Sequence, residues 1–220
     1  MRLLVLGASG GVGSELVRQA VAGGHAVVAL ARPRSAVAAP SGVEVVRGDV
    51  TDGAALQQAL VGVDAVLCAV GMRRANPANP WSRSVSPPDL TATMARRLVA
   101  MMPNAGVRRV IAVSAAGVGD SALQLNVGMR WLLATTMIGD AYRDLERMER
   151  VFAESDLDWL APRPTRLTGG PHTGRVQVVT SFGSFSAISR ADVAGWMLAA
   201  LAQPTWPIPE WGGRSPQISG

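Results

Sequence analysis

The sequence predicts a doubly wound α/β domain, in which helices cover both faces of a parallel sheet. Two patterns support this prediction. Strand-like and helix-like segments alternate along the chain, which is the order that a doubly wound sheet requires. The strand-like segments are also continuous apolar runs, which indicates strands that are buried on both faces. A chain of 220 residues with 48% hydrophobic residues is long enough for one such core. We therefore expect a single domain over residues 1–220.

Each element is expected from its own local pattern. Apolar runs predict strands over residues 2–7, 25–31, 43–49, 64–71, 109–115 and 157–164. The stretches between them predict helices over residues 11–22, 54–60, 90–102 and 142–155. In the first of these helices, Val12, Leu16 and Ala20 share one face, and Gly23–Gly24 ends the helix.

Three segments do not fit this alternation. Residues 72–89 and 116–141 are too long to be plain connections, and each follows a strand at its carboxyl end. Open α/β sheets bind ligands at that edge, so we expect both segments to be substrate-side loops. Residues 203–220 are rich in proline and glycine and are expected to form a C-terminal tail that wraps the surface or frays.

Composition excludes several classes of function. All 21 basic residues are arginine, so no Schiff base or lysine-assisted tyrosine can operate here. The net charge of +5 is scattered along the chain, which argues against a nucleic-acid partner. Two distant histidines and one cysteine give no spacing typical of a metal site.

The single cysteine, Cys68, lies in the apolar run "DAVLCAV". It allows no internal disulfide and fits a reducing compartment. The sequence shows neither a secretory signal nor an apolar stretch long enough to span a membrane. We expect a cytoplasmic protein that is a monomer or a homodimer and binds a small molecule.

Three glycines, Gly7, Gly10 and Gly13, lie three residues apart between the first strand and the first helix. The first lets the chain turn sharply, the second lets the backbone approach a phosphate, and the third lets the helix pack closely on the strand. The helix N-terminus then offers unpaired N–H groups to a pyrophosphate. This context predicts a dinucleotide-binding site.

The residue at the end of the second strand indicates which dinucleotide is bound. Proteins that bind NAD have an acidic residue about 20 residues after the glycine loop, which holds the ribose 2′-hydroxyl. This chain has Arg32 there, followed by Arg34. A guanidinium forms charge-assisted bonds to a 2′-phosphate, so we expect NADP(H). At the end of the third strand, Asp49 is placed to accept from the adenine amino group and Val50 to pack on its ring.

Several segments carry a resemblance to a known family. In chain order these are "GASGGVG", "GDVTD", "AVGMR", "VSAAG", "DLERMERVFAESDLDWLAPRP" and "ISRADVA". The chain resembles the atypical short-chain dehydrogenase/reductases, and among them the NAD(P)H-binding group that includes biliverdin reductase B (flavin reductase) and the NmrA-like proteins. The resemblance covers nearly the whole chain and implies the Rossmann fold.

The resemblance also implies a set of cofactor contacts at successive strand ends. Around the phosphates these are Ser9, Gly10, Gly11 and Val12 for the pyrophosphate and Arg32 for the 2′-phosphate. At the adenine ring the implied contacts are Asp49 and Val50, and at the nicotinamide they are Val113, Ser114 and Pro164. Gly71 and Arg73, which follow the fourth strand, are implied to line the cofactor.

The usual catalytic set of short-chain dehydrogenases, a serine followed by Tyr-x-x-x-Lys, is incomplete here. Tyr142 is the only tyrosine, and Glu146 stands where the lysine belongs. A tyrosine with a pKa near ~10 needs a cation to transfer protons at neutral pH. Tyr142 is therefore a catalytic candidate without its partner. Ser114 is a second candidate, which can donate to a substrate carbonyl or orient the nicotinamide amide. Arg166 is a third, which can hold a carboxylate, phenolate or enolate.

Sulfur-containing and aromatic side chains in the two long loops are expected to line the substrate pocket, since they suit a planar substrate. They are Met72, Trp81, Met129, Trp131 and Met137. His172, in a later loop, is a candidate proton donor near neutral pH.

These observations favour an NADPH-dependent reductase of a planar conjugated carbonyl, quinone or flavin-like molecule. The arginine-only composition points to a GC-rich genome and, by association, to a natural-product pathway. Two alternatives remain open. One is a non-redox cyclase, isomerase or dehydratase on the same fold, which the missing Tyr-Lys pair favours. The other is a non-catalytic NmrA-like regulator that senses NADP(H), with residues 123–138 as its interface.

Overall fold

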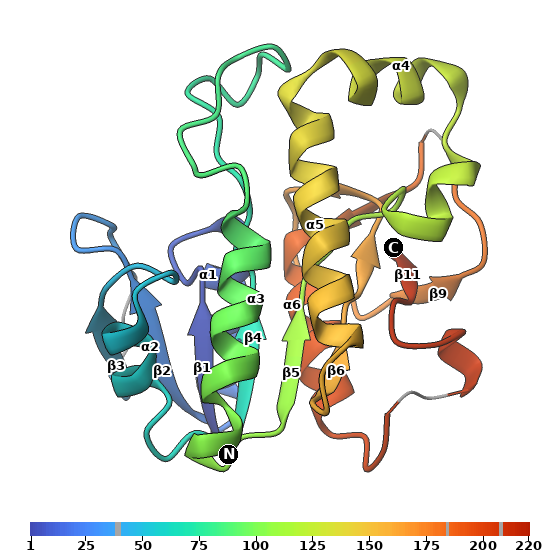
Figure 1. Ribbon diagram of the computed structural model, residues 1–220. Coiled ribbons are helices and arrows are strands. Elements are labelled where there is room, and N and C mark those ends of the chain that lie inside the picture. The colour runs from blue at the N-terminus through green and yellow to red at the C-terminus, as the bar shows by residue number, and fades with distance from the viewer. Residues whose placement is uncertain (38–40, 184, 207–208) are drawn as a thin grey trace.

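The computed structural model describes residues 1–37, 41–183, 185–206 and 209–220. Its centre is a six-stranded sheet in the order β3-β2-β1-β4-β5-β6, with every neighbouring pair parallel (Figure 1). The strands are β1 (Arg2–Leu6), β2 (Ala26–Ala31), β3 (Val43–Arg47), β4 (Ala65–Cys68), β5 (Arg109–Ala112) and β6 (Asp158–Leu160). This is the strand order of the Rossmann fold and confirms the predicted fold class.

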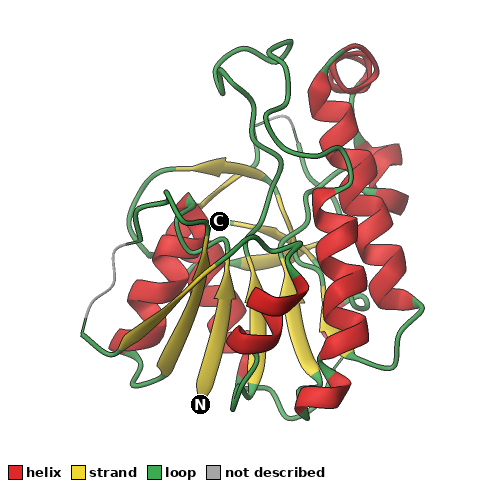
Figure 2. Ribbon diagram, turned by 60° about the vertical axis from the view of Figure 1, so that its left-hand side comes forward, coloured by secondary structure: helices red, strands yellow, loops and turns green. Residues whose placement is uncertain are grey.

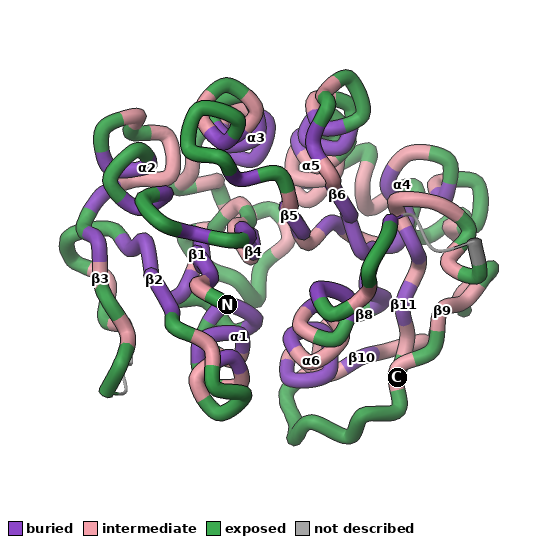
Figure 3. The backbone as a smooth tube through the Cα atoms, turned by 90° about the horizontal axis from the view of Figure 1, so that it is seen from below, coloured by how far each residue is buried: buried purple, intermediate pink, exposed green. Residues whose placement is uncertain are grey.

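Helices cover both faces of the sheet (Figure 3). One face carries α2 (Gly53–Ala59), α3 (Leu90–Met101) and α5 (Met137–Ala153), and the other carries α1 (Gly11–Ala22) and α6 (Arg190–Leu201). Alternate residues of β1 point to opposite layers, since Leu4 and Leu6 pack in the first core and Leu3 and Val5 in the second. All four are fully buried. Burial on both faces explains why the strand is a continuous apolar run.

Most helices have a side chain that satisfies the free N–H groups of the first turn. Asp52, Asn126, Thr136 and Ser189 do so for α2, α4 (Val127–Thr135), α5 and α6. For α3 the acceptor comes from another helix, since the buried Asp144 accepts from the Thr91 amide at 2.7 Å. Helix α1 begins after Gly10, which supplies no side-chain cap, and has no acidic residue in its first turn. Its N-terminus is therefore open to an anion.

The segment 116–141 is not the loop that we expected. It contains the 3₁₀ helix η2 (Gly119–Gln124), helix α4 and the first turn of α5, which begins at Met137 rather than at residue 142. Asn126 accepts from the Met129 amide and Thr136 from the Ile138 amide, and these caps start two helices that apolar periodicity alone did not show. The other long segment, residues 72–89, is mainly loop and projects beyond the carboxyl edge of the sheet (Figure 2).

The C-terminal region forms two small sheets beyond β6. The predicted strand 157–164 is divided, because β7 (Arg163–Pro164) leaves the main sheet and pairs with β11 (Gln217–Ser219). The remaining strands are β8 (Arg166–Thr168), β9 (Gln177–Val179) and β10 (Ala187–Ser189), and the other 3₁₀ helices are η1 (Pro103–Ala105) and η3 (Pro209–Trp211).

The tail prediction for residues 203–220 is wrong for its last part. Strand β11 lies between β7 and β9, and Ile218 is fully buried in the second core. Residues 207 and 208 of that segment lie outside the described residues. Within the described residues no helix is long and apolar enough to cross a membrane.

Candidate functional site

Three cavities lie along the carboxyl edge of the sheet. The first, about 310 Å³, is lined from Gly7 to Leu90 and includes Arg32. The second, about 240 Å³, includes Gly11 and Ser114, and the third, about 560 Å³, includes Ser114 and Arg166. Ala69, Val70 and Gly71 line both the first and the second, and Ser114 and Leu167 line both the second and the third. The three cavities therefore form one groove across the top of the sheet.

The glycine loop forms the floor of this groove for steric reasons. Gly7 has a φ of 79°, and a Cβ there would lie 2.5 Å from the carbonyl oxygen of Ala69. A Cβ at Gly13 would overlap the carbonyl oxygen of Gly7, so glycine at 13 lets α1 pack against the end of β1. The Gly10 amide donates to the Gly7 carbonyl at 2.9 Å and closes the turn. This arrangement leaves the backbone of the loop facing the first cavity.

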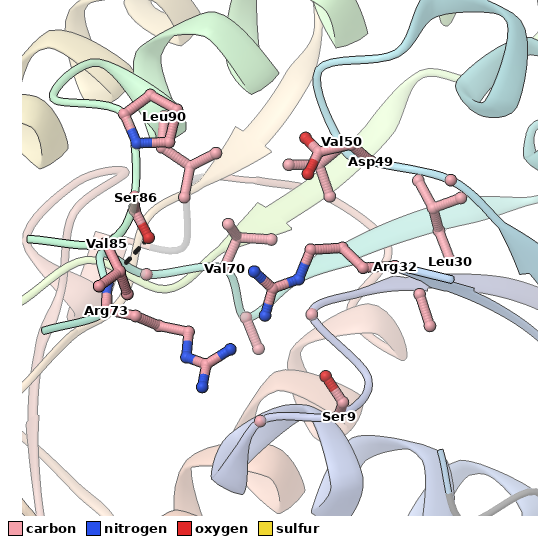
Figure 4. Close-up of a pocket in the computed structure, with 17 residues that line it drawn as sticks. Ser9, Leu30, Arg32, Asp49, Val50, Val70, Arg73, Val85, Ser86 and Leu90 are labelled. Carbon is pink, nitrogen blue, oxygen red and sulfur yellow. Dashed lines mark hydrogen bonds between the residues drawn. The ribbon is translucent and has the colours of Figure 1, made fainter. Parts of the chain in front are cut away.

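Arg32 follows β2 directly, and its side chain extends across the first cavity toward Val70 (Figure 4). Asp49 and Val50 line the same cavity. One carboxylate oxygen of Asp49 accepts from the amide and hydroxyl of Thr51 at 3.0 and 2.8 Å, so Asp49 holds its own turn while facing the cavity. Arg34 is exposed and does not line the cavity.

Segment 72–89 lines the first cavity, at the Arg32 end of the groove, and contributes no residue to the third cavity. Its residues Val85, Ser86 and Pro87 line the first cavity, and Arg73 lies across from Arg32 (Figure 4). The Ser86 hydroxyl accepts from the Arg73 amide at 3.1 Å. Met72 and Trp81 line none of the three cavities, and 57% of Trp81 is exposed.

Ser114 lies just beyond β5, at the junction of the second and third cavities. The side chain is buried, and its hydroxyl donates to the Glu149 carboxylate at 2.5 Å. Since that proton is already committed, the remaining hydrogen-bonding capacity of the hydroxyl is as an acceptor.

Glu149 is itself held by four hydrogen bonds. Besides the bond from Ser114, Arg163 donates to both of its oxygens at 3.0 and 2.6 Å, and the Ser215 hydroxyl donates at 3.1 Å. Arg163 also donates to Asp120, an exposed residue. Burial lowers the pKa of Arg163, but its bonds to the two carboxylates outweigh this and raise the pKa above its ordinary value. The hydrogen bond from Arg163 likewise lowers the pKa of Asp120.

The third cavity is mainly apolar, and its walls come from η2, α4, α5 and β8. The lining side chains include Leu125, Met129, Leu132, Ile138, Pro164, Leu167 and Phe182. Tyr142 and Arg166 supply polar groups. Burial raises the pKa of the Tyr142 hydroxyl and makes it a poorer acid. Arg166 is exposed at the rim.

The structure brings only one of the six residues predicted for the substrate pocket to this cavity. Met129 lines it, whereas Trp131 points outward with 59% exposed and Met137 contributes no lining. Side chains two residues apart on an α-helix point in nearly opposite directions, so Met129 and Trp131 do not share a face. His172 lies against Gly195 of α6, with Nδ1 3.2 Å from Asp192. His172 therefore does not line the third cavity.

Sequence reasoning missed three charged residues, of which Arg190 lines the groove and Glu149 and Arg163 lie behind Ser114. Glu149 and Arg163 belong to the segment quoted for the resemblance, and Arg190 to "ISRADVA", yet none was assigned a role. Glu149 stands among several other charged residues in that segment, so no local signal marked it for burial. Arg190 lines the second cavity beside Gly11 and Val12.

The groove fits a nicotinamide dinucleotide on the evidence of its own residues. The uncapped N-terminus of α1 and the close-packed glycine loop leave space and N–H groups for a pyrophosphate. Arg32 and Arg190 face the groove, and neither forms an ion pair with the described carboxylates. Most of the predicted cofactor residues line the groove, except Gly13, which supports it from below, and Arg34. The individual contacts remain predictions.

Comparison with known proteins agrees with this geometry. The profile of an NAD(P)H-binding family matches residues 7–204. The solved structure of ChuY, an anaerobilin reductase from Escherichia coli O157:H7, shares 24% identity over 99% of this chain and 96% of that chain, with a TM-score of 0.78. A short-chain dehydrogenase/reductase from Veillonella parvula in complex with NADP shares 18% identity over 100% and 94%, with a TM-score of 0.75. A putative NAD-dependent epimerase/dehydratase from Bacillus halodurans shares 24% identity over 100% and 94%, with a TM-score of 0.72. Likeness at these identities establishes the fold.

Proposed function

The chain belongs to the NAD(P)H-binding family, and from this premise we propose that it is an NADPH-dependent reductase of a planar conjugated carbonyl, quinone or flavin-like molecule. The observation that carries the proposal is the continuity of the groove, which joins a nucleotide-sized cavity at Arg32 to an apolar cavity at Arg166. The two meet at Ser114. A cofactor and a substrate bound in these cavities would meet there.

The choice of NADPH over NADH rests on Arg32. Its guanidinium reaches into the first cavity, and the acid in that lining, Asp49, uses one carboxylate oxygen to hold Thr51. A 2′-phosphate would therefore meet a guanidinium with no competing ion pair. The ribose of NADH has a neutral 2′-hydroxyl at this position, which forms no ion pair with the guanidinium.

When bound, the reduced nicotinamide would supply a hydride to an electrophilic atom of the substrate. The protein supplies orientation and a dry pocket. Because the Ser114 proton is donated to Glu149, we assign the Ser114 oxygen as an acceptor for the carboxamide N–H₂ of the cofactor. This assignment selects, from the two roles expected for Ser114, orientation of the nicotinamide over proton donation.

The substrate class follows from the third cavity. Its apolar walls suit a flat ring system, and Arg166 at its rim stabilises the oxygen that gains negative charge on reduction. The proton that completes the reaction would come from water at this exposed rim, because burial makes Tyr142 a weak acid. A role in a natural-product pathway and a cytoplasmic location are part of the same proposal.

Two measurements test this function. First, calorimetric titration of Arg32→Glu should show a loss of NADPH affinity far larger than the loss of NADH affinity, with Arg147→Glu, an exposed residue outside the groove, as the control. Equal losses for the two cofactors would mean that Arg32 does not read the 2′-phosphate.

Second, purified protein should oxidise NADPH with at least one quinone or flavin acceptor, and Arg166→Met should raise KM for that acceptor. Binding of NADPH with no oxidation across a broad acceptor panel would overturn the reductase. A product equal in mass to the substrate, or lighter by one water, would instead establish a non-redox isomerase, cyclase or dehydratase.

One observation favours a second candidate, a regulator that binds NADP(H) and a protein partner. Helix α4 has no buried residue. Its first residue, Val127, is 82% exposed, and Leu123 of the preceding η2 is 87% exposed. Exposed apolar side chains at this density are typical of contact surfaces. A stable complex whose affinity changes with the ratio of NADPH to NADP⁺, formed by a protein without turnover, would favour this candidate over the reductase.

A further inference from the structure

Arg190 is a positive charge at the edge of the second cavity with no assigned partner. It is the first residue of α6 and lines the cavity together with Gly11 and Val12. Within the described part of the chain its guanidinium forms no hydrogen bond or ion pair, and no acidic residue lines this cavity. A charged group in this setting is stabilised by an anion that the protein itself does not supply.

The side chain of Arg190 crosses the start of α1 at very close range. A Cβ at Gly11 would lie 2.5 Å from the Arg190 Cδ and 2.9 Å from its Nε. Glycine at 11 is therefore what allows the arginine to lie there. Its stem is held over the first turn of α1, the turn that has neither a capping side chain nor an acid.

The position of Arg190 at the start of α6 also favours an anionic partner for its guanidinium. The N-terminus of a helix carries partial positive charge, so a cation in its first turn is disfavoured. Asp192, the acid of that turn, is engaged elsewhere, since it accepts from the amides of Thr173 and Gly174 at 2.7 and 3.0 Å and from Ser189 at 2.9 Å. The positive end of α1 and the guanidinium of Arg190 thus act on the same space.

The two helices hold this arrangement firmly. Both pack in the second core, where Leu16 of α1 and Val193 of α6 are fully buried. The Gln19 side chain also donates to the Ala191 carbonyl at 2.8 Å. The position of Arg190 relative to the glycine loop is therefore set by the fold and not by a mobile loop.

We propose that Arg190 binds the pyrophosphate of the dinucleotide, opposite the glycine loop, and so contributes affinity that NADPH and NADH share. This inference rests on the proposed function, because it requires that the dinucleotide occupy the groove. It divides the work between two arginines, with Arg32 binding the 2′-phosphate that distinguishes the cofactors and Arg190 binding the group common to both.

The test measures the affinities of three ligands by calorimetry: NADPH, NADH and adenosine 2′-monophosphate, which has no pyrophosphate. Arg190→Met should weaken NADPH and NADH by the same factor, about 10- to 100-fold for one charged hydrogen-bonding group, and should leave adenosine 2′-monophosphate unchanged. Arg190→Lys should recover part of the loss. The matched control is Arg147→Met, an exposed arginine of α5 that lines none of the cavities.

The outcomes separate this inference from the proposed function. If wild-type protein binds neither dinucleotide, the proposed function fails. If wild-type protein binds both and Arg190→Met binds them equally well, only the role of Arg190 is overturned. A loss of adenosine 2′-monophosphate binding in Arg190→Met, or a lowered melting temperature, would assign Arg190 to general support of the fold and would also overturn the inference.

Discussion

Replacing Glu149 with glutamine removes the charge from a buried carboxylate that accepts four hydrogen bonds. The side chains of Glu149 and Arg163 are 10% and 7% exposed, so the substitution leaves a buried guanidinium with Asp120 as its remaining acidic partner among the described residues. The amide oxygen of the glutamine still accepts a hydrogen bond, but its N–H₂ group then faces donors that bonded to the carboxylate. Breaking a buried pair on one side costs about 3–5 kcal/mol, and the remaining Asp120 contact places the expected loss near ~3 kcal/mol.

Thermal unfolding followed by circular dichroism measures this loss. For a chain of this size, 1 kcal/mol lowers the melting temperature by roughly 2–4 °C, so Glu149→Gln should melt about 6–12 °C lower than wild type. The control is Glu146→Gln on the same helix. Glu146 forms an exposed pair with Arg150 at 3.6 Å, and such a pair contributes at most ~1 kcal/mol.

A reciprocal variant completes the test. Replacing both Glu149 and Arg163 with apolar residues of similar volume should recover much of the stability, because a buried ion pair exchanged for packed apolar groups is often neutral. Equal melting temperatures for Glu149→Gln and Glu146→Gln would refute the reasoning, since they would show that the buried network contributes no more than a surface pair.

Three further outcomes are expected. Hydrogen bonds outweigh burial and lower the pKa of Asp192, so its stabilising effect is present above the ordinary carboxylate pKa and is lost as pH falls through the lowered value. Asp192→Asn should therefore lower the melting temperature at neutral pH, with the difference disappearing in strong acid, and a constant difference would contradict this. Gly13→Ala should prevent NADPH binding or folding, because its Cβ overlaps the Gly7 carbonyl, whereas Gly53→Ala, which meets only the end of a side chain at 3.8 Å, should be tolerated in the same binding and melting assays. Tyr142→Phe should alter KM more than kcat in steady-state assays, because burial raises its hydroxyl pKa, and a fall in kcat of a hundredfold or more would restore it as the proton donor.

The elements that were predicted correctly are those with strong local patterns. Helix α1 matches its prediction over residues 11–22, because its apolar stripe and the glycines at its end are local features. Helix α6 was not predicted. Its apolar residues lie on several sides, with Val193 and Met197 in the core and Trp196 against Trp211, so no single stripe marked it.

The candidate site shows the same division. The glycine loop and Arg32 were found because their chemistry lies within one strand-turn-helix-strand segment. Trp131 lies outside the lining of the third cavity, because the side of α4 that faces the cavity depends on the packing of α4 against α5. That packing places Met129 and Leu132 in the lining of the third cavity.

By itself the sequence determined the layered fold and the glycine loop of an NAD(P)H-binding protein, and it is the source of the proposal that Arg32 binds a 2′-phosphate. Each of these depends on residues close together in the chain. Tertiary structure alone decided that Arg163 holds Glu149 against Ser114, that Arg190 crosses Gly11 and that β11 completes a sheet with β7 and β9. These contacts join residues 14 to 179 positions apart, from Glu149–Arg163 to Gly11–Arg190. No local pattern carries them, because which distant surfaces meet is set by how the helices and strands pack together.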